Sequence, residues 1–197
     1  ILRLTTPEEP DIDLVAPAVE RDPHLSLQML KLVNSPLYCL ERPIESIKEA
    51  VVFLGLAQLR KWAMVLSLLS SSTNSREAQR IVLVRAKFCE LYAKDLGYIS
   101  SEKAFMIGLL SGIDLLLEVD PKKFVTELNL SKDMVGAILY GEGKPGKVLK
   151  LAVSLERLIN MNPERIAKNQ ENSLRIYHEA FHWTENIIRE FFGGDAK

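Results

Sequence analysis

Residues 22–36 read DPHLSLQMLKLVNSP, and this stretch contains a helix start, a helix face and a helix end in succession. Asp22 followed by Pro23 is a typical start, because a carboxylate caps the free amides and proline suits the first helical position. Pro36 marks the end, since a proline disfavours helical geometry at the residue before it. The apolar residues between these marks recur at the spacing of one helix face. They are Leu25, Met29, Leu32 and Val33.

The same pattern continues after this helix. Ser46 and Glu49 match a capping box, in which the two side chains satisfy free amides reciprocally. Gly55 provides a left-handed stop after Leu54. The capping box predicts a helix here and argues against a strand at Val51-Val52-Phe53, although these three residue types also suit strands.

Most of the remaining chain also contains residues that are typical of helix starts and helix ends. We expect helix starts at Thr5-Thr6-Pro7, at Asp120-Pro121 and at Leu130-Ser131, the last of these helices closing at Gly141. We expect Ser100 or Ser101 to cap a helix from Glu102 to Leu117. A break at residues 169–172 precedes a last helix over about residues 173–192, and a frayed tail follows. The sequence predicts an all-α, multi-helix bundle of roughly ten helices without significant sheet.

Composition and charge limit the classes of function. The 197 residues are 47% hydrophobic, and 25 Lys and Arg residues against 26 Asp and Glu residues give a net charge of −1. This balance argues against nucleic-acid binding, which needs a basic field. One helix carries a local basic cluster offset by Glu77 and Glu90, and we interpret it as a solvated face that lies off the apolar stripe of Val82, Ala86 and Cys89. Its members are Arg76, Arg80, Arg85 and Lys87.

Several features predict the compartment and the context of the chain. No apolar run reaches the ~18 residues that a membrane span needs, and no signal peptide is evident. Cys39 and Cys89 show no metal-like spacing, so we predict two buried, reduced thiols in the cytoplasm. The chain begins with Ile1 rather than Met, which suggests a domain excised from a longer protein.

Two short motifs resemble catalytic or cofactor signatures. Residues 178–182, HEAFH, match the HExxH zinc pattern, but no third ligand is suitably placed, so we predict surface or boundary histidines, with an adventitious metal clip as the alternative. Residues 141–146, GEGKPG, match GxGxxG. A dinucleotide fingerprint needs a preceding strand and here a helix precedes it, so we predict a flexible helix–helix loop.

Five blocks with a characteristic order and spacing carry a resemblance to a known family. They are residues 22–26 (DPHLS), 30–35 (LKLVNS), 44–47 (IESI), 50–55 (AVVFLG) and 59–62 (LRKW). Together they resemble the N-terminal part of HDOD domains. Later features, including residues 85–90 (RAKFCE), are similar to the HDOD half of bacterial EAL-HDOD proteins. The resemblance implies one HDOD-type domain over residues 1–197, with an N-terminal helical subregion over about 1–75 and a degenerate HD-like core over about 76–192.

The resemblance also implies where a metal site has been lost. In the related HD phosphohydrolases, a histidine, a His-Asp doublet and a later aspartate hold the metal. The corresponding positions here are Ala86 for the first histidine and Ser111-Gly112 for the doublet, while Glu156 is the only carboxylate where the later acid would fall. Ala, Ser and Gly lack the required donors. We therefore predict no catalytic residue, no metal and no cofactor.

The function expected from this resemblance is a non-catalytic signal-transduction module, linked to cyclic di-GMP or two-component signalling. Its partner would be a protein, or a neighbouring EAL or receiver-type domain. The resemblance gives no prediction of the oligomeric state. The candidate interaction surface is Arg60, Lys61 and Trp62 if Trp62 is exposed, although a buried Trp62 with its N–H bonded is the favoured reading. One alternative is a phosphohydrolase with a relocated site at Asp114, Glu156, His178 and His182. A second is a nucleotide or small-ligand receptor.

Overall fold

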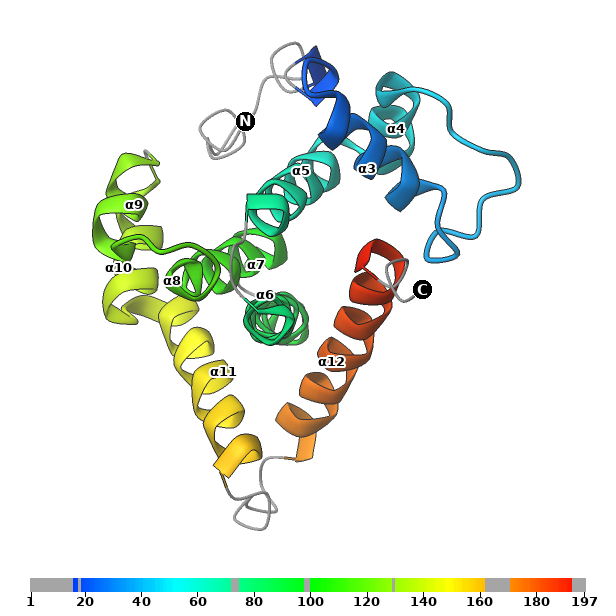
Figure 1. Cartoon of the computed structure of the whole chain (residues 1–197). Coiled ribbons are helices and arrows are strands. Elements are labelled where there is room, and N and C mark those ends of the chain that lie inside the picture. Colours follow the sequence, from blue (N-terminus) through cyan, green and yellow to red (C-terminus); the bar gives the residue numbers. More distant parts are fainter. Residues whose placement is uncertain are drawn as a thin grey trace. The chain divides into compact units, whose positions relative to one another are not determined.

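The computed structural model describes residues 16, 17, 19–71, 75–97, 100–128, 130–161 and 171–192. Every regular element within these ranges is a helix, so the predicted all-α fold class is confirmed (Figure 1). Three predicted features lie outside the described residues, namely the helix start at residues 5–7, the first part of the break at 169–172 and the tail after Phe192. The last helix begins at Glu171, two residues earlier than predicted.

The chain divides into two compact units. Unit 1 comprises Ile1–Ser71 with Ile188–Lys197, and unit 2 comprises Ser72–Ile187. Within unit 1, helices α3 (Pro23–Val33), α4 (Ile47–Leu54) and α5 (Leu56–Ser71) pack against one another. Their shared core is apolar and has almost no exposed surface. It includes Leu25, Met29, Leu32, Val33, Ala50, Leu59, Ala63 and Leu66.

The sequence signals around α3 act as predicted. The Asp22 carboxylate accepts a hydrogen bond from the Leu25 amide at 3.0 Å, which caps the helix. Asn34, at the other end, donates to the carbonyls of Leu30 and Ile44 at 2.9 and 2.8 Å and accepts from the Ile44 amide at 2.7 Å. The Asn34 side chain therefore ties the end of α3 to the loop that leads into α4. The buried hydroxyl of Ser35, by contrast, has no partner among the described groups.

Helix α4 begins at the predicted capping residue. The Ser46 hydroxyl accepts from the Glu49 amide at 3.1 Å, while the Glu49 carboxylate accepts from the Glu45 amide at 3.2 Å rather than from that of Ser46. Gly55, with φ of 75°, ends the helix in a backbone conformation that residues with a Cβ rarely adopt. The predicted helix is confirmed, and the short apolar run within it is not a strand.

Unit 2 is organised around the long helix α6 (Arg76–Leu96). Figure 1 views α6 nearly end-on, with α11 and α12 running on either side of it and α7 beside it. The other helices of the unit are α7 (Ser101–Leu110), α8 (Ile113–Leu116), α9 (Pro121–Glu127), α10 (Lys132–Tyr140), α11 (Gly143–Met161) and the part of α12 (Glu171–Phe192) up to Ile187. Helix α6 supplies much of the core, with Val82, Leu83, Ala86, Phe88, Cys89 and Ala93 buried.

The single helix predicted from Glu102 to Leu117 is instead broken into α7 and α8. Gly112 lies between them with φ of −115°, outside the helical region. The Ser111 hydroxyl donates to the Gly108 carbonyl at 2.7 Å. Such bonds from serine offer the backbone an alternative to helical pairing, and glycine adds freedom to leave the helix.

The prediction of a flexible loop over residues 141–146 is also wrong, because the connection between the helices is much shorter. Gly141 ends α10 with φ of 65°, and α11 already begins at Gly143, so only two residues connect the helices. A Cβ added to Gly146 would lie 2.2 Å from the carbonyl carbon of Gly141. The glycines therefore allow a tight turn between α10 and α11, in which the backbones of Gly141 and Gly146 lie in close contact, rather than a flexible loop.

Two further predictions concern cysteines and membranes. Cys89 is buried as predicted, but Cys39 is exposed and has φ of 46°, so the expectation of two buried thiols is wrong for Cys39. No single helix within the described ranges has the length and apolar character to cross a membrane. Helices α4 and α5 meet these criteria only when taken as a pair, and they are bent by 120° at the break between them.

Candidate functional site

Helices α6 and α7 pack closely where the degenerate metal site is predicted. Ala86 is fully buried on α6. A Cβ added to Gly108 of α7 would lie 2.7 Å from the Cα of Ala86 and 2.9 Å from the carbonyl oxygen of Arg85. A Cβ on Gly112 would lie 2.5 Å from a methyl group of Val82. Small residues thus bring the backbones of the two helices into direct contact.

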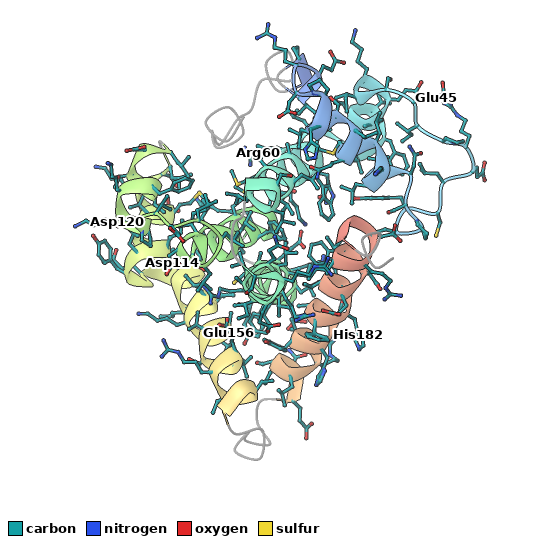
Figure 2. The ribbon with its side chains drawn as sticks, viewed as in Figure 1. Glu45, Arg60, Asp114, Asp120, Glu156 and His182 are labelled. Atoms are coloured by element: carbon teal, nitrogen blue, oxygen red, sulfur yellow. The ribbon has the colours of Figure 1, made fainter. Side chains whose placement is uncertain are left out.

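A buried ion pair lies at this junction. The Arg85 guanidinium donates to the Glu156 carboxylate of α11, from Nε to Oε2 at 3.1 Å and from Nη2 to both oxygens at 3.0 Å. The two side chains are only 8% and 16% exposed. Bidentate pairs of this kind are the stronger class of charge-assisted hydrogen bond. The pair therefore joins α6 to α11 inside unit 2 (Glu156 is labelled in Figure 2).

Ser111 completes the cluster from the end of α7. Arg85 Nη1 donates to the carbonyl oxygen and to the hydroxyl of Ser111, both at 3.3 Å. Four oxygen atoms, two from Glu156 and two from Ser111, thus surround one guanidinium. We call Arg85, Ser111 and Glu156 the arginine junction, because it links three helices through one cation.

Two neutral ionisable groups lie near the arginine junction. Burial raises the pKa of the Tyr177 phenol to about 12, and the Glu156 carboxylate adds to this rise. Burial also raises the pKa of the Cys89 thiol to about 12, although the Arg85 guanidinium opposes the shift. Both groups are therefore protonated near neutral pH, and neither offers a thiolate nucleophile or a charged metal ligand.

The residues present at the junction do not fit a catalytic metal of the HD type. Ala86, Ser111 and Gly112 supply neither imidazole nor carboxylate, and the Glu156 carboxylate is already held by Arg85. Within the described ranges, no group of three His, Cys, Asp or Glu side chains could hold a metal ion. A guanidinium also repels a divalent cation at close range.

The alternative ligand set is not brought together. His178 and His182 are both exposed on α12, and Asp114 is exposed on α8, whereas Glu156 belongs to the arginine junction. Figure 2 labels Asp114, Glu156 and His182 on three different helices. The predicted surface placement of the two histidines is confirmed, and the relocated metal site gains no support from this arrangement.

The candidate surface at residues 60–62 needs a correction. Trp62 is 2% exposed and Lys61 is 6% exposed, so they do not present an open surface. The Trp62 indole N–H donates to the Tyr38 hydroxyl at 2.8 Å, as the buried interpretation predicts. Arg60 is half-buried (Figure 2). Trp62 instead anchors the loop after α3, where the Tyr38 ring meets Phe53 edge-to-face at 5.8 Å.

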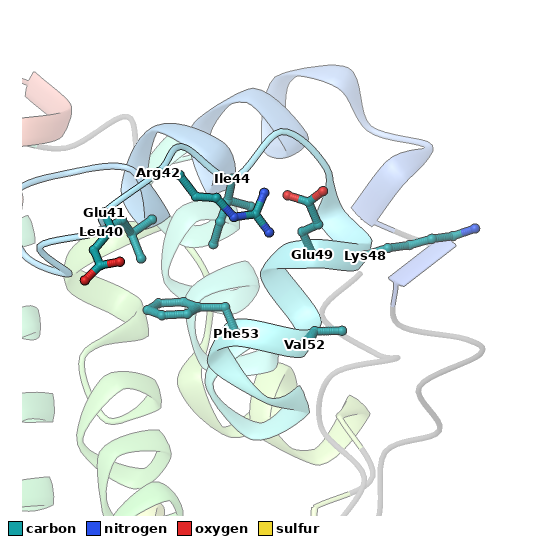
Figure 3. Close-up of a pocket in the computed structure, with 8 residues that line it drawn as sticks. All are labelled: Leu40, Glu41, Arg42, Ile44, Lys48, Glu49, Val52 and Phe53. Atoms are coloured by element: carbon teal, nitrogen blue, oxygen red, sulfur yellow. The ribbon is translucent and has the colours of Figure 1, made fainter.

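A groove in unit 1 lies beside this loop. It encloses about 620 Å³ between the loop and α4, and Figure 3 shows Val52 and Phe53 on α4, with the Phe53 ring extending toward the side of Leu40 and Glu41. Val52 is 87% exposed and Phe53 is 47% exposed, which is unusual for such apolar side chains. The other lining residues are apolar or form a rim of both charges, namely Leu40, Glu41, Arg42, Ile44, Lys48 and Glu49.

Sequence reasoning missed Arg85, which it assigned to a solvated basic face. The signal was present, since Arg85 lies three residues after Val82 and four before Cys89 and thus on their face of the helix. Its partner, Glu156, is the lone carboxylate of its segment. An arginine within an apolar helical stripe is a reason to search for a buried acid.

The described helices and the arginine junction define an all-helical domain in which a buried ion pair joins α6 to α11. The chain belongs to the HDOD domain family, whose family model matches residues 1–134. It is 33% identical over 195 residues to YuxH of Bacillus subtilis, covering 95% of this chain and 47% of YuxH. It is 29% identical over 189 residues to the cyclic di-GMP phosphodiesterase CdgJ of Vibrio cholerae, covering 92% of this chain and 44% of CdgJ.

Solved structures agree with the assignment of the fold. An HDOD domain protein from Geobacter sulfurreducens superimposes with a TM-score of 0.64 at 19% identity, over 98% of this chain and 80% of that protein. At this identity the likeness concerns the fold alone. The chain spans less than half the length of the two curated relatives, so their complete activities belong to longer proteins.

Proposed function

We propose that this domain is a non-catalytic regulatory module of bacterial signalling in the cytoplasm. It would act by binding a protein partner or a neighbouring domain of EAL or receiver type. One observation carries the proposal: where the resemblance places metal ligands, the chain has Ala86, Ser111 and Gly112, and the one nearby carboxylate is paired with Arg85.

One relative supports a link to cyclic di-GMP signalling. CdgJ is a cyclic di-GMP phosphodiesterase, and this chain matches only 44% of it. A domain without donors for a catalytic metal, within a family that includes signalling proteins, suits a role in regulating another domain. We therefore propose that the output is a change in the activity of the partner rather than chemistry on this domain.

The groove of unit 1 is the surface to test first for this contact. Val52 and Phe53 would enter the interface core, with the charged rim around them, as in protein–protein interfaces generally. The partner surface that fits is an apolar patch bordered by both charges. The exposure of Val52 also means that a charge placed there should not disturb the core.

A binding experiment tests the proposal. Immobilised domain would be offered purified EAL and receiver-type domains, and binding would be measured for wild type, Val52→Glu and Leu27→Glu. Leu27 is a matched control, since it is 55% exposed on α3 and does not line the groove. We expect binding by wild type and Leu27→Glu and at least a tenfold loss for Val52→Glu. Absence of binding by wild type to every such domain would count against the proposal.

Metal content separates this proposal from hydrolysis. Purified domain would be assayed for bound Fe, Mn and Zn and for release of phosphate from nucleotides. We expect less than stoichiometric metal and no turnover. Stoichiometric metal together with phosphate release would favour the phosphohydrolase alternative. The small-ligand receptor stays a prediction, which a thermal-shift screen against nucleotides would test.

A further inference from the structure

The arginine junction has the composition of a cation site that already contains its cation. Its four oxygens come from Glu156 on α11 and from Ser111 at the end of α7, while the positive charge comes from α6. Oxygen donors of this kind, carboxylate, carbonyl and hydroxyl, also surround bound hard cations in proteins. The difference is that the charge here is covalently part of the chain.

We infer that the Arg85 guanidinium takes the place of a bound metal ion at this junction, holding α6, α7 and α11 together, so that its removal leaves a site for a small external cation. This goes beyond the proposed regulatory function and does not depend on any partner. The inference rests on the contacts of three residues and on the close approach of α6 to α7 at Gly108.

The surroundings of the junction favour this role over that of an incidental salt bridge. The carboxylate of Glu156 is 16% exposed, so the loss of Arg85 would leave a negative charge with little access to water. A buried charge that loses its partner is strongly destabilising. The nearby Tyr177 phenol and Cys89 thiol are neutral when protonated and negative when ionised, so neither can supply a replacement positive charge.

An alternative is that the Arg85 side chain only fills space beside Glu156. In that case, the positive charge would not contribute to the stability of the fold. The two cases differ in their response to added cation. If the charge is required, a truncated Arg85 should be rescued by a small cation that reaches Glu156 and Ser111. If only volume is required, a neutral molecule of the same shape should rescue equally well.

The experiment measures the midpoint of thermal unfolding for Arg85→Ala with and without millimolar methylguanidinium, with methylurea as the neutral control. We expect Arg85→Ala to lower the midpoint by roughly 10 °C, the size expected for breaking a buried pair in a domain of this length. Methylguanidinium should restore several degrees of that loss, and methylurea should restore none. Wild type should show no stabilisation by either compound.

Two further variants serve as controls. Arg85→Ala combined with Glu156→Gln should lose the response to methylguanidinium, because the negative charge that holds the cation is gone. Arg175→Ala removes an exposed arginine, 63% exposed and 3.9 Å from Glu179, and should neither lower the midpoint nor create a response. Equal responses to methylguanidinium and methylurea, or no response in Arg85→Ala, would overturn the inference.

A second measurement covers the case in which Arg85→Ala does not fold. Arg85→Gln, Glu156→Gln and the double variant form a double-mutant cycle by urea unfolding. We expect a coupling of at least tenfold in the unfolding equilibrium constant, since each single change removes one charge of the same pair. Additive effects in this cycle would overturn the inference independently of the rescue experiment.

Discussion

Single side chains fix the local geometry of unit 1, and Asn34 is the main example. Although it is exposed, Asn34 makes three hydrogen bonds that tie the end of α3 to Ile44. We expect Asn34→Ala to lower the free energy of unfolding by about 1–3 kcal/mol, because the carbonyl and the amide of Ile44 both lose their bond to the Asn34 side chain. Urea denaturation followed by circular dichroism measures this loss.

Asn172→Ala is the matched control for Asn34. Asn172 is also exposed, but its side-chain bonds within the described ranges go to the side chains of Asp95 and Arg175, which can turn to water. We expect a change within about 0.5 kcal/mol. Similar losses for the two alanine variants would show that the main-chain links of Asn34 are not important.

Cys89 provides a prediction about pH. Its ordinary pKa of 9.0 is raised by burial to about 12 in the folded protein, so above pH 9 the unfolded chain releases a proton that the folded chain retains. Unfolding thus becomes more favourable as pH rises from about 9 to 12, and this thiol contributes a slope of up to about 1.4 kcal/mol per pH unit. We expect Cys89→Ala to show a shallower alkaline loss of stability, measured by urea unfolding across this range.

Cys39→Ala is the control for that experiment, because it leaves the buried thiol in place. It should retain the alkaline slope of the wild type. If the two cysteine variants have the same slope, burial of the Cys89 thiol does not contribute to the pH dependence.

At the level of helices, the contact between α6 and α7 depends on Gly108. Its missing Cβ would meet main-chain atoms of α6, which cannot move without displacing the helix. We expect Gly108→Ala to reduce the free energy of unfolding by about 1–3 kcal/mol through overpacking. Chemical denaturation of the purified variant checks this value.

Gly136→Ala is the matched control within another helix of unit 2. An added Cβ there would meet only the end of the flexible Glu142 side chain, at 2.7 Å. Since alanine favours helix over glycine by up to about 1 kcal/mol, this variant should be neutral or more stable. Destabilisation by both substitutions would mean that the close approach at Gly108 has no special importance.

Helix starts and stops were predictable because their signals are local. Asp22, Ser46 and Gly55 act through the backbone of their own turn, so the residues alone indicate a cap. The errors occurred where tertiary packing decides. Gly112, at the break between α7 and α8, lies close against Val82 of α6, and the two-residue turn before Gly143 depends on contact between glycine backbones.

For the same reason, only part of the candidate site could be predicted from the sequence. The sequence indicated which positions lack metal donors, since Ala86, Ser111 and Gly112 are visible without any structure. It did not indicate what fills their place. Arg85 and Glu156 are 71 residues apart, so their pairing appears only once α6 and α11 are packed together.

For the whole molecule, the division into two compact units leads to a prediction about additivity. Asn34 belongs to unit 1 and Gly108 to unit 2, and their contacts share no residue. The effects of Asn34→Ala and Gly108→Ala on the free energy of unfolding should therefore add to within about 0.5 kcal/mol. The double variant, compared with both single variants by urea denaturation, tests this. An interaction energy above about 1 kcal/mol would mean that the two sites are energetically linked.

Because Arg85 is part of the polypeptide, the positive charge of the arginine junction is present as soon as α6, α7 and α11 pack together. On the inference that this side chain takes the place of an ion, the domain would assemble even where iron or manganese is scarce, whereas a domain that depends on a metal ion would have to acquire it first.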